Sequence, residues 1–505
     1  MKILFIYPNA GSQLGFNYGV AHISAVLKKA GHHVDFRQLC EDLGPLPTKN
    51  EFVTDLKDMN PDIIGFSVVT NQWQYAAQLA EWIRETLNIP LVCGGIHATI
   101  AAEEILETGL FDYVFLGECE DAFPEFVEKM NRNEDIEHIR NMGFIANGKV
   151  KINPVRPLPD LQGLPFKDYD AFDFQNIIDA KNGWVGVMAS RGCPFKCTYC
   201  FNHLMVEKYR GDLQCSFKDL KYIRHFKVEQ VIDEIVFLQE NYKNISMFIF
   251  DDDLFTFNRD YVVEFCKAYK TVSNLPFVVN AHIGFFDEDR AFHLADAGCK
   301  IVKFGVESGS KKIRSKIMNR HMSNKKIIKS INLVRRYNMH SSVFIMIGLP
   351  YEDRDDVMDT ITFLSQAKPG RFRWTFFFPF PGTVSHKMSI DGGYVNVNKM
   401  NSLLNFTDSS ALDFGEEHNL FLEKVGRIMP WFVNAYADFE ASPVYLEKVE
   451  KIIQMDRSEW KKVSPALHDE DKRLTLQFQE KNQSHYAVKY NPFMGVISDY
   501  FMNEN

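Results

Sequence analysis

The chain has 505 residues, of which 46% are hydrophobic and 24% charged, and its formal net charge is −9. This length exceeds one ordinary core, so two or three domains are expected, with the composition of a soluble globular protein. The acidic balance argues against a nucleic-acid surface, and no run of about eighteen apolar residues indicates a transmembrane helix. Pro8 and Asn9 cut the apolar start short, which favours a strand over a signal peptide.

Residues 1–135 alternate short apolar runs with amphipathic segments, which predicts a doubly wound, Rossmann-like parallel sheet. Strands are predicted at 2–7, 34–37, 63–67, 91–93 and 113–116, and helices at 18–30, 51–59, 74–87 and 101–106. The loops after the strands carry small residues, which let the backbone approach a large flat or phosphate-bearing ligand. No G-x-G-x-x-G follows the first strand, so a dinucleotide is disfavoured.

Residues 136–183 are predicted to hold a hairpin and a linker. Residues 143–152 read as a hairpin that turns at Asn147-Gly148. Pro154, Pro157 and Pro159 then break the chain into an extended segment. Because leucines are interleaved with the prolines, we expect this linker to lie across both neighbouring domains.

Residues 184–384 contain six further strand–helix units. Strands are predicted at 184–189, 246–250, 277–281, 301–306, 342–347 and 373–378. Helices are predicted at 228–240, 259–271, 287–297, 325–337 and 353–367. The polar residues fall at the carboxyl ends of these strands, where parallel α/β folds place their chemistry.

Three cysteines, Cys193, Cys197 and Cys200, follow the first of these strands at the spacing C-x3-C-x2-C. Thiolates are the usual ligands of iron–sulfur clusters, and three of them can hold three irons and leave the fourth open. A zinc site is an alternative, because His203 could supply a fourth ligand. Inert buried thiols are a further alternative. Nine cysteines, an odd number, favour a reducing cytoplasm over a disulfide framework.

The cysteine loop, with aromatic Tyr199 before its last cysteine, closely resembles that of the radical S-adenosylmethionine (radical SAM) superfamily. The resemblance implies a partial (β/α)6 barrel and a [4Fe-4S] cluster whose open iron chelates S-adenosylmethionine (SAM). It also implies an external one-electron reductant of flavodoxin or ferredoxin type. Reduction would cleave SAM to a 5′-deoxyadenosyl radical, with the protein supplying position and shelter.

The resemblance also implies SAM-binding residues in the cysteine loop, at strand ends and at Arg320. These are Tyr199, Phe201, Asp251, Asp252, Asn280, His282, Glu307 and Arg320. An aspartate of the Asp251–Asp253 triplet would bind the ammonium group, although a divalent-metal site or a helix-initiating role are alternatives. Glu307 would accept from ribose hydroxyls, or act as an acid before a helix. Arg320 would meet the carboxylate of SAM, or be solvated.

The loops of residues 1–135, above all 94–99 with 116–118, resemble the cobalamin-binding domain that precedes the radical SAM domain in one large subfamily. The predicted cobalamin contacts are Asn9, Ser67, Val69, Thr70, Asn71, Gln72, Gly94, Gly95, His97, Ala98, Thr99, Leu116, Gly117, Glu118 and Glu120. The D-x-H-x-x-G motif of methionine synthase is lacking, so His97 is expected near the corrin without ligating cobalt. Asn71 or Gln72 could touch cobalt or simply cap the next helix. A flavodoxin-like sheet that merely docks is the alternative to a cobalamin domain.

Two regions depart from the strand–helix rhythm. Residues 202–227 form a long basic and aromatic connection, interpreted as a contact with an acidic substrate or as a solvated flap. Residues 385–505 are expected to be mainly helical, to cover the barrel mouth and to set substrate choice. An aromatic stripe there, including Trp431, Phe432 and Tyr436, is more typical of a core than of a substrate site.

The sequence therefore predicts a cobalamin-dependent radical SAM methyltransferase that acts on an unactivated carbon, or on phosphorus, through methylcobalamin. Its substrate would be a small molecule or a peptide, and no nucleic acid is expected. Three alternatives stay open: a cobalamin-dependent rearrangement, oxidation or cyclisation without methyl transfer, a methylthiotransferase, and a non-catalytic iron–sulfur redox module. Substrate identity and oligomeric state do not follow from the sequence.

Overall fold

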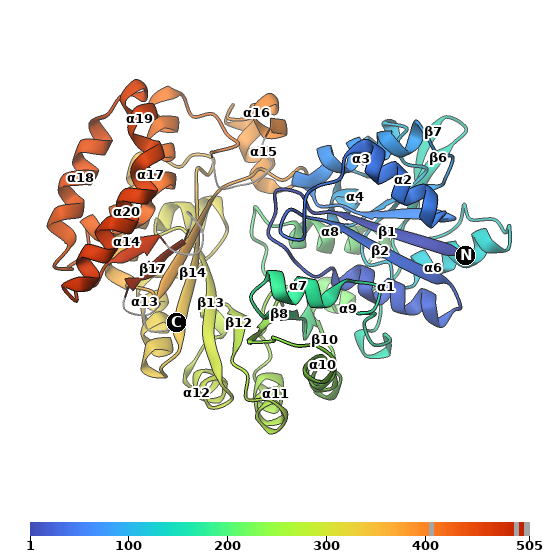
Figure 1. The fold of residues 1–505 in the computed structure, drawn as a ribbon, viewed down its shortest axis with the longest axis horizontal. Helices are drawn as coiled ribbons and strands as arrows, with labels where there is room; N and C mark the ends of the chain where they lie inside the picture. Colours follow the sequence, from blue (N-terminus) through green and yellow to red (C-terminus); the bar gives the residue numbers. More distant parts are fainter. Residues whose placement is uncertain (403–408, 489–493, 499–505) are drawn as a thin grey trace. The chain divides into compact units, whose positions relative to one another are not determined.

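The computed structural model describes residues 1–402, 409–488 and 494–498 (Figure 1). The chain divides into two compact units. The first comprises residues 1–195 and 200–253, and the second comprises residues 196–199 and 254–505. The cysteine loop is thus shared, with its middle cysteine in the second unit. No helix in the described part of the chain combines the length and apolarity needed to cross a bilayer.

A seven-stranded sheet in the order β2-β1-β3-β4-β5-β6-β7 forms the core of the first unit. Its parallel strands are β1 (Lys2–Pro8), β2 (His33–Leu39), β3 (Ile63–Ser67), β4 (Leu91–Gly94) and β5 (Tyr113–Phe115), which confirms the five predicted strands. The predicted hairpin is also present, as β6 (Met142–Ala146) and β7 (Lys149–Ile152). It is not part of a linker, because β6 pairs antiparallel with β5 and extends the sheet.

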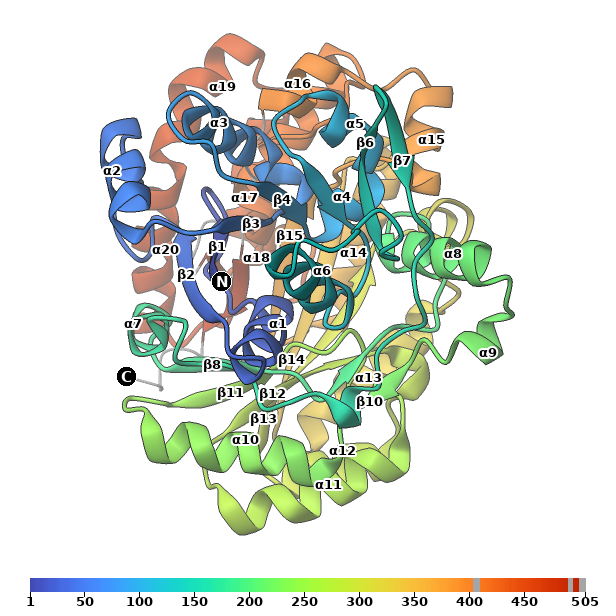
Figure 2. The same ribbon diagram turned by 90° about the vertical axis from the view of Figure 1, so that its right-hand side faces the viewer.

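Helices cover both faces of this sheet, as a doubly wound fold requires. In both views α1 (Tyr18–Lys29) lies beside α6 (Ala122–Asn131), and α2 (Lys49–Met59) beside α3 (Trp73–Arg84) (Figures 1 and 2). The α2–α3 face also carries α5 (Ala102–Glu107), and its core includes Leu4, Phe66 and Leu79.

One stretch expected as a loop is helical. Residues 96–100 form the short helix α4 (Ile96–Ile100), and the backbone N–H of His97 donates to the Val68 oxygen at 3.1 Å. Gly95 precedes α4 with φ of 90°, and a Cβ there would lie 2.6 Å from that same oxygen. Gly95 therefore lets its backbone approach that of Val68 closely, and α4 begins directly after this contact.

The proline-rich segment is packed within the first unit. It holds η2 (Leu161–Gly163) and α7 (Phe174–Ala180), and leads to the parallel pair β8 (Trp184–Val187) and β11 (Met247–Phe250) with α10 (Val228–Asn241). Buried Lys167 pairs with buried Glu234 of α10, which also accepts from the Tyr169 hydroxyl. The Tyr169 ring stacks on Phe16 at 5.0 Å. This segment thereby ties α10 to the start of α1.

Residues 202–227 are not a solvated flap. They form α8 (Phe201–Leu213), α9 (Phe217–Leu220) and the strand β10 (Arg224–His225), which pairs antiparallel with β9 (Ser190–Arg191). Val206, Tyr209 and Tyr222 are buried in the same core cluster as Leu116, at the end of β5. The flap prediction was wrong because these few apolar side chains have a partner that only the tertiary fold reveals.

The second unit is built on a sheet in the order β16-β17-β15-β14-β13-β12. Its parallel strands are β12 (Phe277–Ala281), β13 (Cys299–Glu307), β14 (His340–Ile347) and β15 (Arg371–Phe376). The helices between them are α11 (Arg259–Val272), η3 (Ile283–Phe285), α12 (Glu288–Asp296), the π-helix η4 (Ile313–Ile317), α13 (Asn324–Arg336) and α14 (Arg354–Ala367). With β8 and β11 of the first unit, all six predicted strands of this series are confirmed.

The region after β15 is mainly helical, as predicted. Its helices are α15 (Val384–Asp391), α16 (Val397–Ser402), α17 (Glu416–Ala435), α18 (Ser442–Gln454), α19 (Arg457–Val463), η5 (Ser464–Ala466) and α20 (Leu467–Glu480). Trp431 and Phe432 are buried, which confirms the core assignment of the stripe, whereas Tyr436 is exposed. Two strands were not predicted: β17 (Met494–Ile497) pairs antiparallel with β15, and β16 (Tyr486–Val488) with β17.

Candidate functional site

A cavity of about 630 Å³ lies in the first unit, at the carboxyl ends of the strands of the seven-stranded sheet. Its rim includes Ser67, Gly94 and Gly117 from the loops after β3, β4 and β5. Its far side is formed by residues on both flanks of the cysteine loop, among them Arg191 and Phe201. The cavity thus joins the ligand-binding edge of the first sheet to the chain segments that carry Cys193 and Cys200.

Below the rim the cavity continues as an apolar slot. Phe5, Gly65, Phe115 and Phe123 line it, on the face of the sheet that α1 and α6 cover. Gly65 has no side chain to fill the slot, and a Cβ there would lie 2.9 Å from the Phe5 ring. The slot can therefore hold an extended, largely apolar group without displacing the strands.

The predicted cobalamin residues divide into two groups by their position relative to this cavity. Those that line it are Ser67, Val69, Gly94, Gly95, Gly117, Glu118 and Glu120. The lining does not include Asn9, Thr70, Asn71, Gln72, His97, Ala98, Thr99 and Leu116. The second group supports the rim from behind, as shown by Thr99, whose hydroxyl oxygen accepts from the Gly117 N–H at 2.9 Å.

The Gln72 side chain does not cap α3, contrary to one sequence interpretation. Gln72 is buried at the N-cap of α3 without a side-chain cap bond, and donates to the Asn9 side chain at 2.7 Å. Asn71 donates to the Ser12 hydroxyl at 3.1 Å. His97 is buried against Trp73, with ring centroids 5.0 Å apart, and burial lowers its pKa to about 4.

Glu118 and Glu120 are engaged by arginines next to the cysteine loop. Arg191 Nη1 lies 2.6 Å from a carboxylate oxygen of each glutamate, and Arg224 pairs with the other oxygen of Glu118. Burial alone raises the pKa of Glu118, but the two arginines outweigh it and hold this pKa below its usual value. The backbone N–H of Glu118 donates to the Tyr209 hydroxyl at 2.8 Å.

The three aspartates after β11 hold the flanks of the cysteine loop. Asp252 is fully buried and accepts from the Ala189 N–H at 3.1 Å and from the Ser190 hydroxyl. Asp253 accepts from the Gly192 N–H at 3.2 Å and from the Asn202 side chain at 3.0 Å. No helix starts at the triplet, because α11 begins at residue 259 with Asn258 as its N-cap, so the helix-initiating interpretation was wrong.

Burial perturbs the second aspartate of this triplet. Burial raises the pKa of Asp252 to about 7, although the bonds from Ser190 and Ala189 oppose the shift. Asp251 accepts from the Tyr18 hydroxyl at 2.8 Å, and Asp251 and Asp253 line the cavity while Asp252 does not. Of the two aspartates predicted to bind SAM, only Asp251 therefore faces open space within the first unit.

None of the nine cysteines, all of which lie in the described residues, is joined in a disulfide. Cys193 and Cys200 are half-buried in the first unit, where Cys200 is the N-cap of α8, and Cys197 is buried in the second unit. Within the described ranges, no three His, Cys, Asp or Glu side chains are gathered as a ready-made metal site, whether for a cluster or for zinc with His203. The ligand role of the three cysteines therefore stays a prediction.

In the second unit, residues 196–199 are anchored by hydrogen bonds to the end of the π-helix and to α15. The Thr198 N–H donates to the Met318 oxygen at 3.3 Å, and its hydroxyl donates to the Ile317 oxygen at 2.5 Å. The Ser385 N–H donates to the Thr198 oxygen at 3.0 Å. A π-helix leaves terminal carbonyls without helical partners, and here they hold the residue between Cys197 and Tyr199.

Arg320 gathers several predicted SAM residues in the second unit. Its Nη1 lies 3.3 Å from both Cys197 Sγ and the Tyr199 hydroxyl, and its Nη2 donates to the Gly305 oxygen. Burial lowers the pKa of Arg320, but Tyr199, Glu307 and Cys197 outweigh it and raise this pKa. Arg320 is therefore not a solvated side chain.

Glu307 ends β13 with φ of 71°, in the left-handed region that non-glycine residues seldom adopt. Burial raises its pKa, against the attraction of Arg320 and a hydrogen bond with Tyr199. It is the last residue of β13, and the helical turn that follows begins at residue 311. Backbone strain of this kind clusters at functional sites.

The other two predicted SAM residues lie near the end of β12. Asn280 is half-buried in the strand, and its carbonyl oxygen accepts from the Phe255 N–H at 3.1 Å. His282 accepts from the Gly284 N–H at 2.9 Å through Nδ1, and burial, aided by Arg320, lowers its pKa to about 3. The neutral ring is thus suited to accept hydrogen bonds.

One residue of this site was missed at the sequence level. Arg314, in the π-helix, is 1% exposed and donates to the Ser308 oxygen at 2.5 Å, to the Met322 oxygen at 3.1 Å and to the Asn324 side chain. It thereby ties the turn after Glu307 to the loop after Arg320. Nothing in the sequence distinguishes it from the many lysines and arginines around it.

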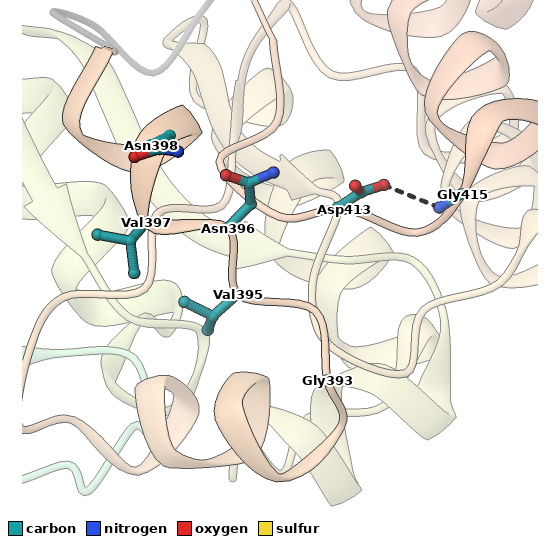
Figure 3. A pocket seen from close by; sticks show the side chains of 7 residues that line it. All are labelled: Gly393, Val395, Asn396, Val397, Asn398, Asp413 and Gly415. Carbon is teal, nitrogen blue, oxygen red and sulfur yellow. Dashed lines mark hydrogen bonds between the residues drawn. The ribbon is translucent and has the colours of Figure 1, made fainter.

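A separate hollow of about 550 Å³ lies in the second unit (Figure 3). It is lined by Gly393, Val395, Asn396, Val397, Asn398, Asp413 and Gly415, and Asp413 accepts from the Gly415 N–H at 3.0 Å. No residue predicted from the sequence to bind a cofactor lines it.

Comparison with known families matches two models. Residues 12–127 match the model described as "B12 binding domain", and residues 187–364 match that described as "Radical SAM superfamily". The first match covers β2 to β5 and the cavity rim, and the second covers the cysteine loop and the strands from β11 to β14.

Two relatives of known sequence cover most of the chain. A protein named "Uncharacterized methyltransferase PH0819" from Pyrococcus horikoshii is 28% identical over 76% of this chain and 82% of its own length. Cytidylyl-2-hydroxyethylphosphonate methyltransferase from Streptomyces wedmorensis is 25% identical over 69% of this chain and 73% of its own. Among solved structures, the cobalamin-dependent S-adenosylmethionine radical enzyme OxsB aligns over 95% of this chain and 73% of its own, with a TM-score of 0.64 at 15% identity, which is a likeness of fold.

Proposed function

Because the chain belongs to the cobalamin-dependent radical SAM enzymes, we propose that it transfers a methyl group to an unactivated carbon or to a phosphorus centre. The family brings three cofactors: a [4Fe-4S] cluster, SAM and cobalamin. The observation that carries the proposal is the cavity of the first unit, which borders both the rim of the cobalamin-type sheet and the flanks of the cysteine loop. The methyltransferase names of the two relatives support it.

The residues present fit a cobalamin. The small rim residues Gly94 and Ser67 leave the strand ends open, and the slot beneath them is apolar. A cobalamin would be held there by the rim residues Ser67, Gly94 and Gly117. His97 would not ligate the metal, because it is buried against Trp73 and does not line the cavity.

The residue types of the cysteine loop and of the second unit suit the cluster and SAM, although within the described residues the three cysteines are not gathered as a ready-made site. Cys193, Cys197 and Cys200 would hold the cluster, and the guanidinium of Arg320 lies 3.3 Å from Cys197 Sγ. Glu307, with its strained backbone, offers carboxylate oxygens for hydroxyl groups of SAM. When bound, the three cofactors supply one-electron cleavage of SAM and a transferable methyl group, chemistry that no side chain provides.

The proposal extends to partners and setting. The substrate would be a small molecule or a peptide, and the electron would come from an external flavodoxin or ferredoxin. Nine cysteines, with no disulfide among the described residues, favour a reducing compartment such as the cytoplasm. The net charge of −9 disfavours a nucleic-acid substrate.

The test is anaerobic reconstitution followed by turnover with SAM carrying a ¹³C-labelled methyl group. We expect 5′-deoxyadenosine and a product heavier by one methylene equivalent, and coupling of the label to ³¹P would mark a phosphorus acceptor. Cys197→Ala should abolish both. Deoxyadenosine without any methylated product, across phosphinate and heteroaromatic candidate acceptors, would instead support a rearrangement, oxidation or cyclisation.

A further inference from the structure

The glutamates after β5 raise a question that their predicted role does not answer. Both line the cavity, as cobalamin contacts would, yet both oxygens of Glu118 and one oxygen of Glu120 are paired with Arg191 or Arg224. These arginines stand at the two ends of the chain segment 192–223, which contains all three cysteines of the loop. Arg191 lies two residues before Cys193.

The two arginines face each other in an unfavourable position. They are direct partners in the antiparallel pairing of β9 with β10, and each of these strands has only two residues. Like charges directly opposite each other destabilise a strand pair, and a ladder this short is marginal by itself. Side-chain exposure of 13% for each arginine means that water screens their repulsion poorly.

Glu118 relieves that repulsion. One oxygen lies 2.6 Å from Arg191 Nη1 and the other pairs with Arg224 Nη2, while Glu120 supplies a second negative charge to Arg191. The negative charges of two carboxylates therefore balance the positive charges of two guanidinium groups in a cluster with little solvent exposure. Arg224 adds a bond from Nη1 to the Pro159 oxygen at 2.8 Å, which fixes its position.

The glutamate itself is held in place from α8. Its N–H donates to the Tyr209 hydroxyl, and Gly117 before it has φ of 72° with no room for a side chain, since a Cβ would lie 2.3 Å from that hydroxyl. Tyr209 is fully buried. The negative charge is thus placed by a rigid loop and not by a freely rotating surface side chain.

We propose that Glu118 is a positioning residue that closes the base of the cysteine loop by bridging Arg191 and Arg224, and is not primarily a cobalamin contact. The loop after β5 then couples the cobalamin-binding sheet to the cluster-binding segment. The proposal rests on the proposed function only in naming that segment as cluster-binding. The bridge itself belongs to the protein before any cofactor is loaded.

The first measurement uses the full chain without cofactors. Hydrogen exchange of peptides that cover residues 188–195 and 220–226 is compared in the wild type, Glu118→Gln and the double variant Glu118→Gln/Arg224→Gln. We expect at least tenfold faster exchange in Glu118→Gln, and recovery in the double variant because the charge balance is restored. Glu125→Gln, which breaks the partly exposed pair of Glu125 with Arg156 in the same unit, is the matched control and should leave these peptides unchanged.

The second measurement follows cofactor uptake. Glu118→Gln should lower iron per chain and alter the electron paramagnetic resonance signal of the reduced cluster, while its cobalamin affinity stays within about threefold of wild type. The reverse pattern, weakened cobalamin binding with normal exchange and normal iron content, would overturn the proposal.

Two controls keep these outcomes distinct. Near-ultraviolet circular dichroism reports folding, and a global loss of structure in Glu118→Gln that the second substitution does not relieve also counts against the bridge. A wild-type protein that takes up no cluster would refute the proposed function, while the exchange comparison would still decide the role of Glu118.

Discussion

Asp252 offers a quantitative test of how the cysteine loop is held. Its carboxyl is fully buried beneath Ala189 and Ser190, and burial raises its pKa from a usual value of 3.8 to about 7. In the folded state the group keeps its proton to about pH 7, whereas the unfolded chain releases it near pH 4. The contribution of this group to the free energy of unfolding is therefore most favourable below pH 4 and falls as the pH rises, by about 4 kcal/mol in all, with no further loss above about pH 7.

The perturbation is Asp252→Asn, which cannot ionise. Its cost in rearranged hydrogen bonds to Ser190 and Ala189 does not depend on pH, so the variant should gain on the wild type by about 2–3 kcal/mol between pH 5 and pH 8. The assay is the urea midpoint of each protein at several pH values in that range. Asp58→Asn, at an exposed position on α2, is the control and should track the wild type. Parallel pH profiles for Asp252→Asn and wild type would refute the reasoning.

Three further predictions follow from other contacts. Lys167→Met leaves the buried carboxylate of Glu234 without a cation and should lower the free energy of unfolding in urea by about 3–5 kcal/mol. Adding Glu234→Gln should recover most of this loss, and a double variant whose two losses simply add would contradict the pairing. Gly95→Ala places a Cβ against backbone atoms at positive φ, so it should lower the free energy of unfolding by at least about 1–3 kcal/mol and weaken cobalamin binding. Gly94→Ala is the control and should have a small effect, because the nearest atom to its Cβ would lie 3.6 Å away. Equal effects of the two substitutions would argue against backbone strain at Gly95. Arg320→Met should raise the Kd for SAM at least tenfold by calorimetry, and an unchanged Kd would remove this residue from the SAM site.

The sequence allowed most of the strands to be placed, because parallel strands buried on both faces appear as short apolar runs between turn signals. β3 and β12 have the predicted bounds. Prediction from the sequence failed for strands whose pairing partners are distant in the chain. β16 and β17 have three and four residues, and only their pairing beside β15 makes them strands. α8 has few buried side chains, and what buries them is the end of β5.

The candidate site shows the same division. Residue type and position placed Glu118 and Asp251 after strand ends, where the structure has them, whereas Arg320 lies in the loop between the π-helix and α13. The sequence could not reveal what each side chain contacts, because hydrogen-bond partners such as Arg224 or Tyr209 lie in a segment with no recognisable pattern. The sequence therefore assigned Glu118 to cobalamin without foreseeing that its oxygens pair with Arg191 and Arg224.

The central claim is that three thiols of one loop bind a cluster that cleaves SAM next to a cobalamin. The most direct measurement is the electron paramagnetic resonance spectrum of the reconstituted, reduced protein with and without SAM, for the wild type and Cys197→Ala. The account predicts a [4Fe-4S] signal that shifts when SAM is added to the wild type, and neither signal nor shift in the variant. A SAM-dependent shift that survives in Cys197→Ala, or a wild type that binds zinc and no cluster, would contradict it.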